Sequence, residues 1–360
     1  MKGSRHILAL SVMAVVVLIA VEATAADRRA RRSHQPVTAR EPVENLRGTT
    51  LVAGSGKATI ISSGRRTTVR LRRGERLNEI AETGRGWVAA GLREESGGTG
   101  LVVMRRSASR GGTDRLPSPD SDKGFYRAAP RILVERDELA GLAWLEGERP
   151  DRMTVRAAQW NGAGWIDSVE VAGLAPGSQT GLAQAVLADG SWLLVWSRFD
   201  GRENDLYWSR RTGGNWTPAM RLEPSDGVPD VTPTLLATAD GALLAWSEYD
   251  GHDYRLRAAR FAGGGWRRLS VDAGPGVLQP KFIRQATGAW VLVRTALPRG
   301  WAALEIRTDG SAGRLARVET TALDRPLLRP TGSGMAFDWA GARQGDGDGD
   351  GRWSRWETQR

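Results

Sequence analysis

Short apolar runs separated by Asp-Gly and glycine-rich turns fill the chain from about residue 49 onward. The stretch Val186–Leu222 shows the pattern most clearly. It contains an Asp-Gly turn, an apolar run that ends in Trp-Ser, further turns and a later tryptophan, and the same order begins again at Leu236. Alternating apolar and polar positions bounded by such turns predict antiparallel strands. In this stretch and the residues just before it, we predict four strands, at Leu182–Leu187, Trp192–Arg198, Leu206–Arg211 and Trp216–Leu222.

The repeat continues along the chain, marked by a proline 13 or 14 residues before the central apolar position of a unit. Pairs of this kind are Pro130 and Trp144, Pro233 and Trp246, Pro280 and Val293, and Pro326 and Trp339. Together with the stretches 78–91 and 179–196, they place six centres near residues 91, 144, 196, 246, 293 and 339. A repeat of about 50 residues built of short strands is typical of a β-propeller blade. We therefore predict an all-β fold, a six-bladed β-propeller of four-stranded antiparallel blades, with five or seven blades as alternatives.

Spare strands at the two ends of the chain predict how the ring closes. Strands predicted at Thr50–Ala53, Ala58–Ser62 and Thr67–Leu71 precede the first unit, whereas the last unit ends with one strand at Trp353–Gln359. We expect the N-terminal strands to complete the last blade, because closure of the ring removes both exposed sheet edges.

The third turn of a unit carries a motif, which is clearest at Ser209–Trp216. Ser209, Gly213 and Trp216 match the turn Ser-x-Asp-x-Gly-x-x-Trp, but Arg211 stands where the aspartate belongs. Over about residues 90–340 the chain resembles the sialidase-like (BNR or Asp-box repeat) propellers. The resemblance implies their fold. It gives no catalytic residue, because the sialidase Arg-Ile-Pro segment finds only a distant counterpart at Tyr126–Pro130.

The N-terminus predicts export. Lys2 and Arg5 precede an apolar run at Ile7–Val21, and small residues follow it, so residues 1–26 read as a signal peptide with cleavage near Ala25 or Ala26. We therefore expect a periplasmic or secreted protein with no membrane span in its mature form, a retained anchor being the alternative. The chain has no cysteine, so its core alone must hold the fold.

The net charge of +10 is concentrated near the N-terminus, where residues 27–110 carry 18 Lys and Arg against 8 Asp and Glu. Residues 27–48 are polar, contain Pro36 and Pro42, and predict a disordered basic arm before the propeller domain at 49–360. The arm either contacts an anionic surface or is simply solvated. The rest of the chain is nearly neutral, so we expect no nucleic-acid partner.

The second turn of a unit joins its second and third strands, and in three units this turn is acidic. Because neighbouring strands run in opposite directions, these turns lie on one face of the ring, together with the start of a neighbouring unit. We predict this acidic-turn face as the binding face for a glycan or a protein. An alternative is that these residues only form turns, since Asp and Gly dominate hairpins for conformational reasons. Its candidate residues are Asp200, Asp205, Asp230, Asp250 and Asp253.

The last unit contains an Asp-Gly repeat that matches the calcium-loop pattern D-x-D-x-D-G-x₅-E. Alternate carboxylates supply hard oxygen ligands, and Gly351 permits a sharp turn. We therefore predict an EF-hand-type Ca²⁺ loop within residues 344–358, a flexible tail being the alternative. Its candidate metal-site residues are Asp346, Asp348, Asp350, Arg352, Ser354 and Glu357.

These patterns together predict an exported, monomeric, non-catalytic module that binds a glycan or protein or serves as a scaffold, and carries one Ca²⁺ loop. The alternative is a glycoside hydrolase with two carboxylates across the central funnel, with Asp230 as a candidate. A purely structural envelope protein is the third reading. With histidines only at positions 6, 34 and 252, a multi-histidine metal site or a His-based triad is excluded.

Overall fold

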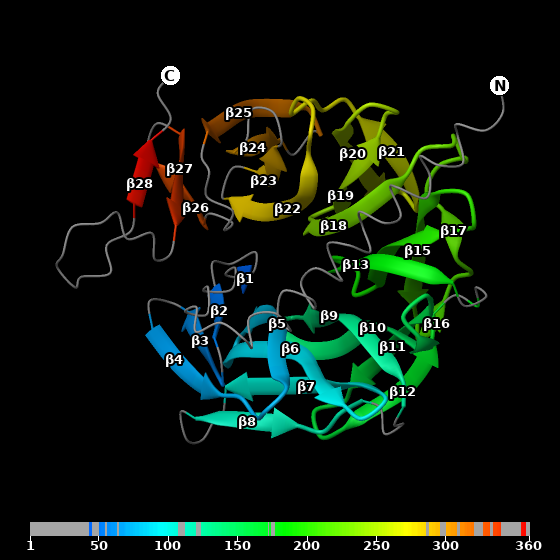
Figure 1. The fold of residues 1–360 in the computed structure, drawn as a ribbon, viewed down its shortest axis with the longest axis vertical. Coiled ribbons are helices and arrows are strands. Elements are labelled where there is room, and N and C mark those ends of the chain that lie inside the picture. Colours follow the sequence, from blue (N-terminus) through cyan, green and yellow to red (C-terminus); the bar gives the residue numbers. More distant parts are fainter. Residues whose placement is uncertain are drawn as a thin grey trace, which may run out of the picture. The chain divides into compact units, whose positions relative to one another are not determined.

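A computed structural model gives the fold as antiparallel strands throughout (Figure 1). The described part of the chain contains no helix, and hence none that is long and apolar enough to cross a membrane. The residues described are 43–44, 50–54, 56–62, 65–106, 112–119, 124–171, 173, 177–285, 288–295, 300–307, 310–319, 327–331, 334–339 and 354–357.

The described strands form seven antiparallel sheets, and each is built from consecutive strands. The first sheet contains β1 (Val43–Glu44), β2 (Thr50–Gly54), β3 (Lys57–Ser62) and β4 (Arg65–Arg70). The second contains β5 (Glu75–Thr83), β6 (Gly86–Glu95), β7 (Gly98–Arg106) and β8 (Thr113–Leu116). The third contains β9 (Tyr126–Glu135), β10 (Glu138–Arg149), β11 (Arg152–Trp160) and β12 (Trp165–Glu170).

The remaining sheets repeat this order. The fourth contains β13 (Ser178–Val186), β14 (Trp192–Phe199), β15 (Asn204–Thr212), β16 (Asn215–Trp216) and β17 (Met220–Arg221). The fifth contains β18 (Asp230–Thr238), β19 (Gly241–Tyr249), β20 (Tyr254–Ala262) and β21 (Gly265–Leu269). The sixth contains β22 (Leu278–Gln285), β23 (Gly288–Thr295), β24 (Gly300–Ile306) and β25 (Ala312–Glu319), and the seventh β26 (Leu327–Thr331), β27 (Gly334–Trp339) and β28 (Ser354–Glu357).

The predicted repeat coincides with this order of sheets. Each of the six predicted centres lies in the second strand of a sheet, in β6, β10, β14, β19, β23 and β27. The strand predicted at the C-terminal end of the chain is also present, as β28. The sequence repeat therefore marks six of the seven described sheets.

The N-terminal strands differ from the prediction. They pair with one another and with β1, which lies inside the predicted basic arm, and they do not pair with β26–β28. The hydrophobic residues Leu51 and Ile60 pack with Leu77 and Trp87 of the second sheet in one buried cluster. With β1 as a fourth strand, this segment has enough strands to form a separate sheet. The described strands thus form seven sheets instead of six, and no sheet is closed by strands from both ends of the chain.

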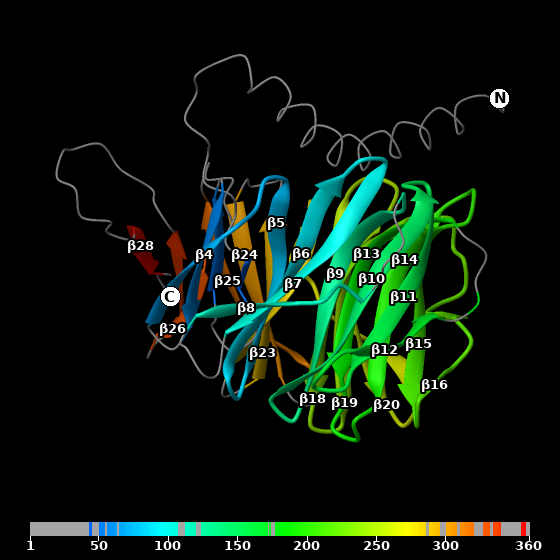
Figure 2. The same cartoon turned by 90° about the horizontal axis from the view of Figure 1, so that it is seen from below.

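The core lies between successive sheets, which stand side by side in Figure 2. Because the second strand of a sheet has neighbours on both faces, its residues form a continuous buried run, as in β14 and β19. Outer strands such as β12 are mostly exposed. The repeated tryptophans Trp144, Trp196 and Trp246 are fully buried and belong to the core.

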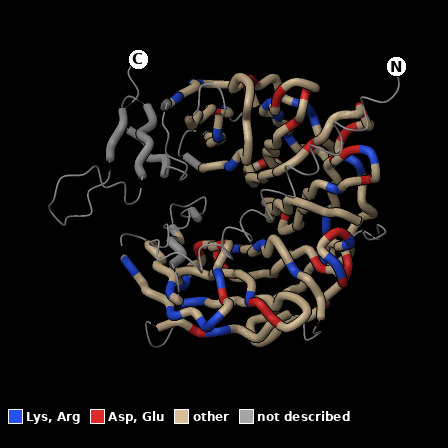
Figure 3. Tube along the Cα trace, viewed as in Figure 1, with Lys and Arg blue, Asp and Glu red and all other residues tan. Residues whose placement is uncertain are grey.

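Charged residues of both signs are distributed over the described sheets (Figure 3). Most of the ion pairs join residues at strand ends and turns, for example Arg149 with Asp151 and Arg255 with Asp250. A few are buried, and these lie near the ends of inner and central strands. Two places on this framework bring polar side chains together, a pocket at the first strands and the acidic turns.

Candidate binding site

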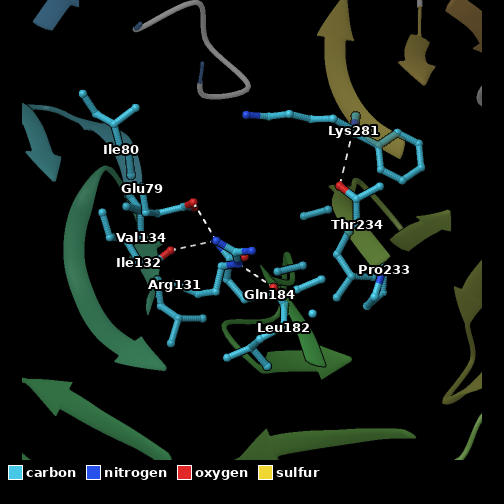
Figure 4. Close-up of a pocket in the computed structure, with 18 of the residues that line it drawn as sticks. Glu79, Ile80, Arg131, Ile132, Val134, Leu182, Gln184, Pro233, Thr234 and Lys281 are labelled. Carbon is cyan, nitrogen blue, oxygen red and sulfur yellow. Dashed lines mark hydrogen bonds and ion pairs between the residues drawn. The ribbon is translucent and has the colours of Figure 1, made fainter. Parts of the chain in front are cut away.

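The first strands of five successive sheets line a pocket of about 590 Å³ (Figure 4). These strands are β5, β9, β13, β18 and β22, and each contacts the next in chain order. Because each of these strands pairs along its length with the buried second strand of its sheet, the pocket wall is built directly on the core.

A β-bulge recurs in all five strands at the same place. The pairing register shifts between Leu77 and Glu79 in β5, between Thr180 and Leu182 in β13, and at equivalent points in β9, β18 and β22. The repeat prolines mark three of these bulges, at Pro130, Pro233 and Pro280. A bulge turns the following residues relative to the regular pleat, and bulges are frequent beside binding sites.

The residues just before these prolines have left-handed backbone conformations. Ala129, Thr232 and Gln279 have φ values of 47°, 54° and 51°, and Gly181 has 58° in β13. A residue before proline normally prefers an extended conformation, and a β-branched residue such as Thr232 is rarely left-handed. The surrounding sheets therefore hold these residues in a conformation that they would not adopt alone, and such sites often serve function.

One repeat position supplies the side chains that distinguish the pocket. In each of the five strands it pairs with the residue directly before the centre of the unit, and it is occupied by Glu79, Arg131, Ala183, Thr234 and Lys281. All five line the pocket. The same register position thus carries an acid, two bases, a hydroxyl and a methyl group, a variation that packing alone does not require.

Arg131 connects three of the strands. Its guanidinium lies 3.1 Å from a carboxylate oxygen of Glu79 in β5, and its Nε donates a hydrogen bond to the carbonyl oxygen of Leu182 in β13. Gln184 donates to the carbonyl oxygen of Ile132 at 3.0 Å. On the opposite side of the pocket from Glu79, Thr234 accepts a hydrogen bond from the backbone N–H of Phe282 at 3.5 Å. The side chain of Lys281 lies on the same side of the pocket as Thr234 (Figure 4). Contacts within the protein therefore hold the side chains of Arg131, Gln184 and Thr234.

The carboxylates of the pocket come from one strand. Glu79 and Glu82 belong to β5, and the lining residues of β9, β13, β18 and β22 include no acid. A glycoside hydrolase needs two carboxyl groups on opposite sides of the scissile bond, about 5–10 Å apart. The lining does not offer such a pair across the pocket.

The acidic-turn face has a different structure. Asp200 accepts hydrogen bonds from the backbone N–H groups of Arg202 and Glu203, and Asp250 accepts from those of His252 and Asp253. These are the contacts by which aspartate stabilises its own turn.

Both turn carboxylates also bind arginine. Asp200 contacts Arg221 at 3.3 Å, and Asp250 contacts Arg255 at 2.9 Å. The N–H of Asp253 and the Arg255 guanidinium hold the pKa of Asp250 well below its usual range. Burial works to raise the pKa of Asp200, but the N–H groups of Arg202 and Glu203 and the Arg221 guanidinium outweigh it and lower this pKa. Backbone N–H groups of the turn and an arginine thus already contact both carboxylates.

Two other predicted residues are buried. Burial raises the pKa of Asp205 to about 6, with Glu203 and Asp200 adding to the rise and Arg221 opposing it. Asp230 pairs across the sheet with Glu248, next to the β19–β20 turn, so it lies at the predicted end of its sheet. Burial raises the pKa of Asp230 to about 8, although it accepts a 2.7 Å hydrogen bond from the indole N–H of Trp246.

Asp230 lies outside the pocket lined by the first strands. It is 8 % exposed, is bonded to a core tryptophan, and is not among the residues that line that pocket. Its predicted role as a funnel carboxylate stays a prediction. The predicted calcium loop lies outside the described residues, except for the backbone of Ser354–Glu357 in β28.

The turn that resembles an Asp-box is stabilised by the residue that departs from the motif. Arg211 donates to the carbonyl oxygen of Gly214 at 3.2 Å and to the side chain of Gln159 in the third sheet at 3.0 Å. Its guanidinium lies 4.7 Å from the ring centroid of Trp192, which in turn packs edge-on against Trp216. The arginine thus replaces the missing aspartate by bonding the turn and joining two sheets.

No protein-family model matches the sequence, and no curated protein matches it. Among solved structures the chain is similar to an α-L-arabinanase of Penicillium chrysogenum complexed with arabinobiose, with TM-score 0.50, 12 % identity and coverage of 84 % of this chain and 94 % of that one. It is also similar to a puromycin-hydrolyzing peptidase of Mycobacterium tuberculosis, with TM-score 0.50, 15 % identity and coverage of 84 % and 49 %. A fucose-specific lectin from Aleuria aurantia has TM-score 0.45, 11 % identity and coverage of 80 % and 98 %.

The arabinanase is a β-propeller protein. The fold is of the β-propeller type. The chain spans about half the length of the peptidase that it matches. At such low identity the likeness concerns the fold alone, and the activity must be argued from the residues of this chain.

Sequence reasoning did not find the pocket residues, although a signal for them was present. Arg131, Thr234 and Lys281 each directly follow a repeat proline. The prolines served to locate the units, but the bulge that they mark, and the direction in which the next residue points, depend on pairing with the second strand.

Proposed function

We propose that this chain is an exported, non-catalytic binding module. We propose further that it binds a glycan in the pocket lined by β5, β9, β13, β18 and β22, which we call the inner-strand pocket. The observation that supports this most is the single repeat position at which Glu79, Arg131, Thr234 and Lys281 meet around one cavity. Its volume of about 590 Å³ lies within the range of about 300–1,000 Å³ typical of small-molecule sites.

The chemistry of the lining favours a sugar. Sugars carry hydroxyl groups that both donate and accept hydrogen bonds, and they also have apolar ring faces. The pocket offers donors and acceptors next to the partly exposed apolar side chains of Ala81, Val134 and Val186. A cationic amine at Lys281 also suits a glycan with a carboxylate or other acidic group.

The proposal prefers binding to hydrolysis because the carboxylates of the lining all belong to β5. It also prefers the pocket to the acidic-turn face, since Asp200 and Asp250 are engaged by their own turns and by arginines. Export by the N-terminal signal, a monomeric state, kinship with the sialidase-like propellers and a Ca²⁺ loop at residues 344–358 belong to the same proposal.

A glycan array followed by isothermal titration calorimetry with the best glycans tests the binding function. The matched pair of variants is Lys281→Met, in the pocket, and Lys57→Met, at an exposed position of β3. Both remove one lysine charge while keeping most of the side-chain volume. We expect Lys281→Met to weaken binding of the selected glycan by about tenfold or more, the effect of a charged hydrogen bond, and Lys57→Met to leave it unchanged.

Two outcomes would contradict the proposal. Binding that both lysine variants retain in full would place the ligand outside the pocket. Release of new reducing ends from the bound glycan, abolished by Glu79→Gln, would make the chain a glycoside hydrolase.

The calcium loop has a separate test, in which calorimetry with Ca²⁺ is repeated on the Asp348→Ala, Asp350→Ala double variant. Loss of a Ca²⁺ site in this variant supports the loop.

A further inference from the structure

We infer that the carboxylates of Asp200, Glu203 and Asp205, at the β14–β15 turn, form a binding site for Ca²⁺. The site is separate from the inner-strand pocket and from the C-terminal loop. Each of the three residues offers a carboxylate oxygen, and these oxygens lie within 4.8 Å of one another. Donor atoms around a Ca²⁺ ion, at about 2.3–2.6 Å from it, can be separated by up to about 5 Å.

A second observation supports a cation at this turn, namely a buried carboxylate oxygen without a partner. Glu203 and Asp205 are each 4 % exposed, and Oε2 of Glu203 is buried without a hydrogen-bond donor, whereas Oδ2 of Asp205 contacts the guanidinium of Arg221 at 3.1 Å. Glu203 forms no ion pair among the described residues, and only its other oxygen is bonded, by the hydroxyl of Ser225. A buried carboxylate oxygen without a partner is costly, so such a group normally meets a proton, an arginine or a metal ion.

The residue paired with the central tryptophan differs between this sheet and its two neighbours. In the third and fifth sheets, the residue paired with the central tryptophan is an arginine, Arg156 or Arg257, and each binds a buried glutamate. In the fourth sheet the same position, paired with Trp196, is Tyr207. The fourth sheet therefore lacks an arginine at this register position.

Arg221 balances only part of the negative charge. It lies 3.3 Å from Asp200, 3.1 Å from Asp205 and 3.2 Å from the hydroxyl of Tyr207. Arg221 thus contacts two of the three carboxylates, and no contact with Glu203 is present among the described residues. The neighbouring cluster of Glu223, Asp230 and Glu248 is different, because Arg257 and Arg268 both bind Glu248 and Arg268 also binds Glu223.

The donor set selects the type of ion. It consists of carboxylate oxygens only, which suit a hard cation and not zinc or copper. Ca²⁺ accepts irregular geometry and completes its shell with water, whereas Mg²⁺ demands a near-ideal octahedron. Asp200 is exposed at the edge of the cluster, so an ion and its waters can enter from that side. Bound there, the ion would fix the β14–β15 turn to the segment that contains Ser225.

The test uses the purified protein with Asp348→Ala and Asp350→Ala, so that the C-terminal loop cannot contribute. After treatment with EDTA, Ca²⁺ is added and followed by calorimetry and by thermal unfolding. We expect one site and a rise in Tm. Glu203→Gln should abolish both, whereas Glu223→Gln, in the neighbouring cluster, should retain both. Terbium luminescence excited through Tyr207 and Trp196 gives a third readout, lost in Glu203→Gln.

Glu203→Gln should fold, because it removes an unpaired buried charge. We expect its Tm in EDTA to equal or exceed that of the background protein, while its response to Ca²⁺ disappears. If Glu203→Gln does not fold, Asp200→Asn at the exposed edge replaces it. The inference is overturned if Ca²⁺ up to about 10 mM, above the weakest extracellular sites, gives neither heat nor a shift. It is also overturned if the folded cluster variant retains the response.

Discussion

Asp230 makes the stability of the protein depend on pH in a direction opposite to that of most carboxylates. The residue is 8 % exposed and bonded to Trp246, with Glu248 and Glu223 nearby. Burial raises its pKa to about 8, and the two glutamates add to the effect. The informative perturbation is Asp230→Asn, which keeps the shape and the oxygen that accepts from Trp246 but can carry no charge.

The sign follows from proton binding. Between about pH 4, the pKa of an aspartate in the unfolded chain, and pH 8, the folded protein holds a proton at Asp230 that the unfolded chain has lost. The contribution to stability is therefore fully present below pH 4 and is lost as the pH rises through 8. Each pH unit in the middle of this window costs about 1.4 kcal/mol. From pH 6 to pH 8, where the loss levels off, the total is about 2 kcal/mol.

Equilibrium unfolding in urea at pH 6, 7 and 8, followed by tryptophan fluorescence, measures the effect. Asp205, whose pKa is about 6, is half titrated at the start of this window, but its titration is common to both proteins and cancels in the difference between them. We expect the free energy of unfolding of the unsubstituted protein to fall relative to that of Asp230→Asn by about 2 kcal/mol across the window. Asp151→Asn, which removes an exposed turn carboxylate, is the control and should follow the unsubstituted protein.

A difference between Asp230→Asn and the unsubstituted protein that stays constant from pH 6 to pH 8 would refute the reasoning. It would mean that Asp230 is already charged at pH 6 in the folded state. The same result would require the nearby arginines, and not a proton, to neutralise the cluster of Asp230, Glu223 and Glu248.

Two further perturbations test the packing of the sheets. Arg127→Met should lower the free energy of unfolding by about 3 kcal/mol, because it removes a buried guanidinium 2.8 Å from Glu146. The control Arg149→Met, at an exposed turn, should lower it by less than about 0.5 kcal/mol. Urea unfolding of both variants measures the difference. Gly241→Ala should reduce the yield of folded protein or lower Tm strongly, because the φ of Gly241 is 152° and a Cβ there would overlap a backbone carbonyl oxygen of β20. The control Gly251→Ala, with φ 95° and no atom within 4 Å of the added Cβ, should show only the smaller cost of its backbone conformation. Thermal melts followed by circular dichroism compare the two variants.

The order of the strands was predictable from the sequence because it depends on local patterns. The turns, the Trp-Ser runs and the prolines recur with the repeat, and each predicted centre lies in the second strand of a sheet. The N-terminal strands were also predicted individually. Their pairing was not, since the two-residue strand β1 has no apolar pattern of its own and exists only through its bonds to Thr50 and Leu51.

The candidate sites divide in the same way. The sequence showed that Asp200, Asp205, Asp230, Asp250 and Asp253 belong to turns or strand ends at one end of the sheets. Only the structure separates them, because Asp250 bonds its own turn, Asp230 is buried against Trp246, and Asp205 shares a pocket of negative charge with Glu203. Burial and the number of nearby arginines decide these differences, and neither can be read from spacing.

By itself, the sequence determined an all-β chain of repeated four-stranded units, with tryptophans at fixed core positions. It did so because strand alternation and turn chemistry act over a few residues. The tertiary structure alone decided that Glu79, Arg131, Thr234 and Lys281 meet around one pocket. Neighbours in this set are about 50 or about 100 positions apart, a spacing set by the repeat, with Ala183 at the equivalent position between Arg131 and Thr234. They come together only because a bulge recurs at the same register in five first strands, β5, β9, β13, β18 and β22, and the sheets pack side by side.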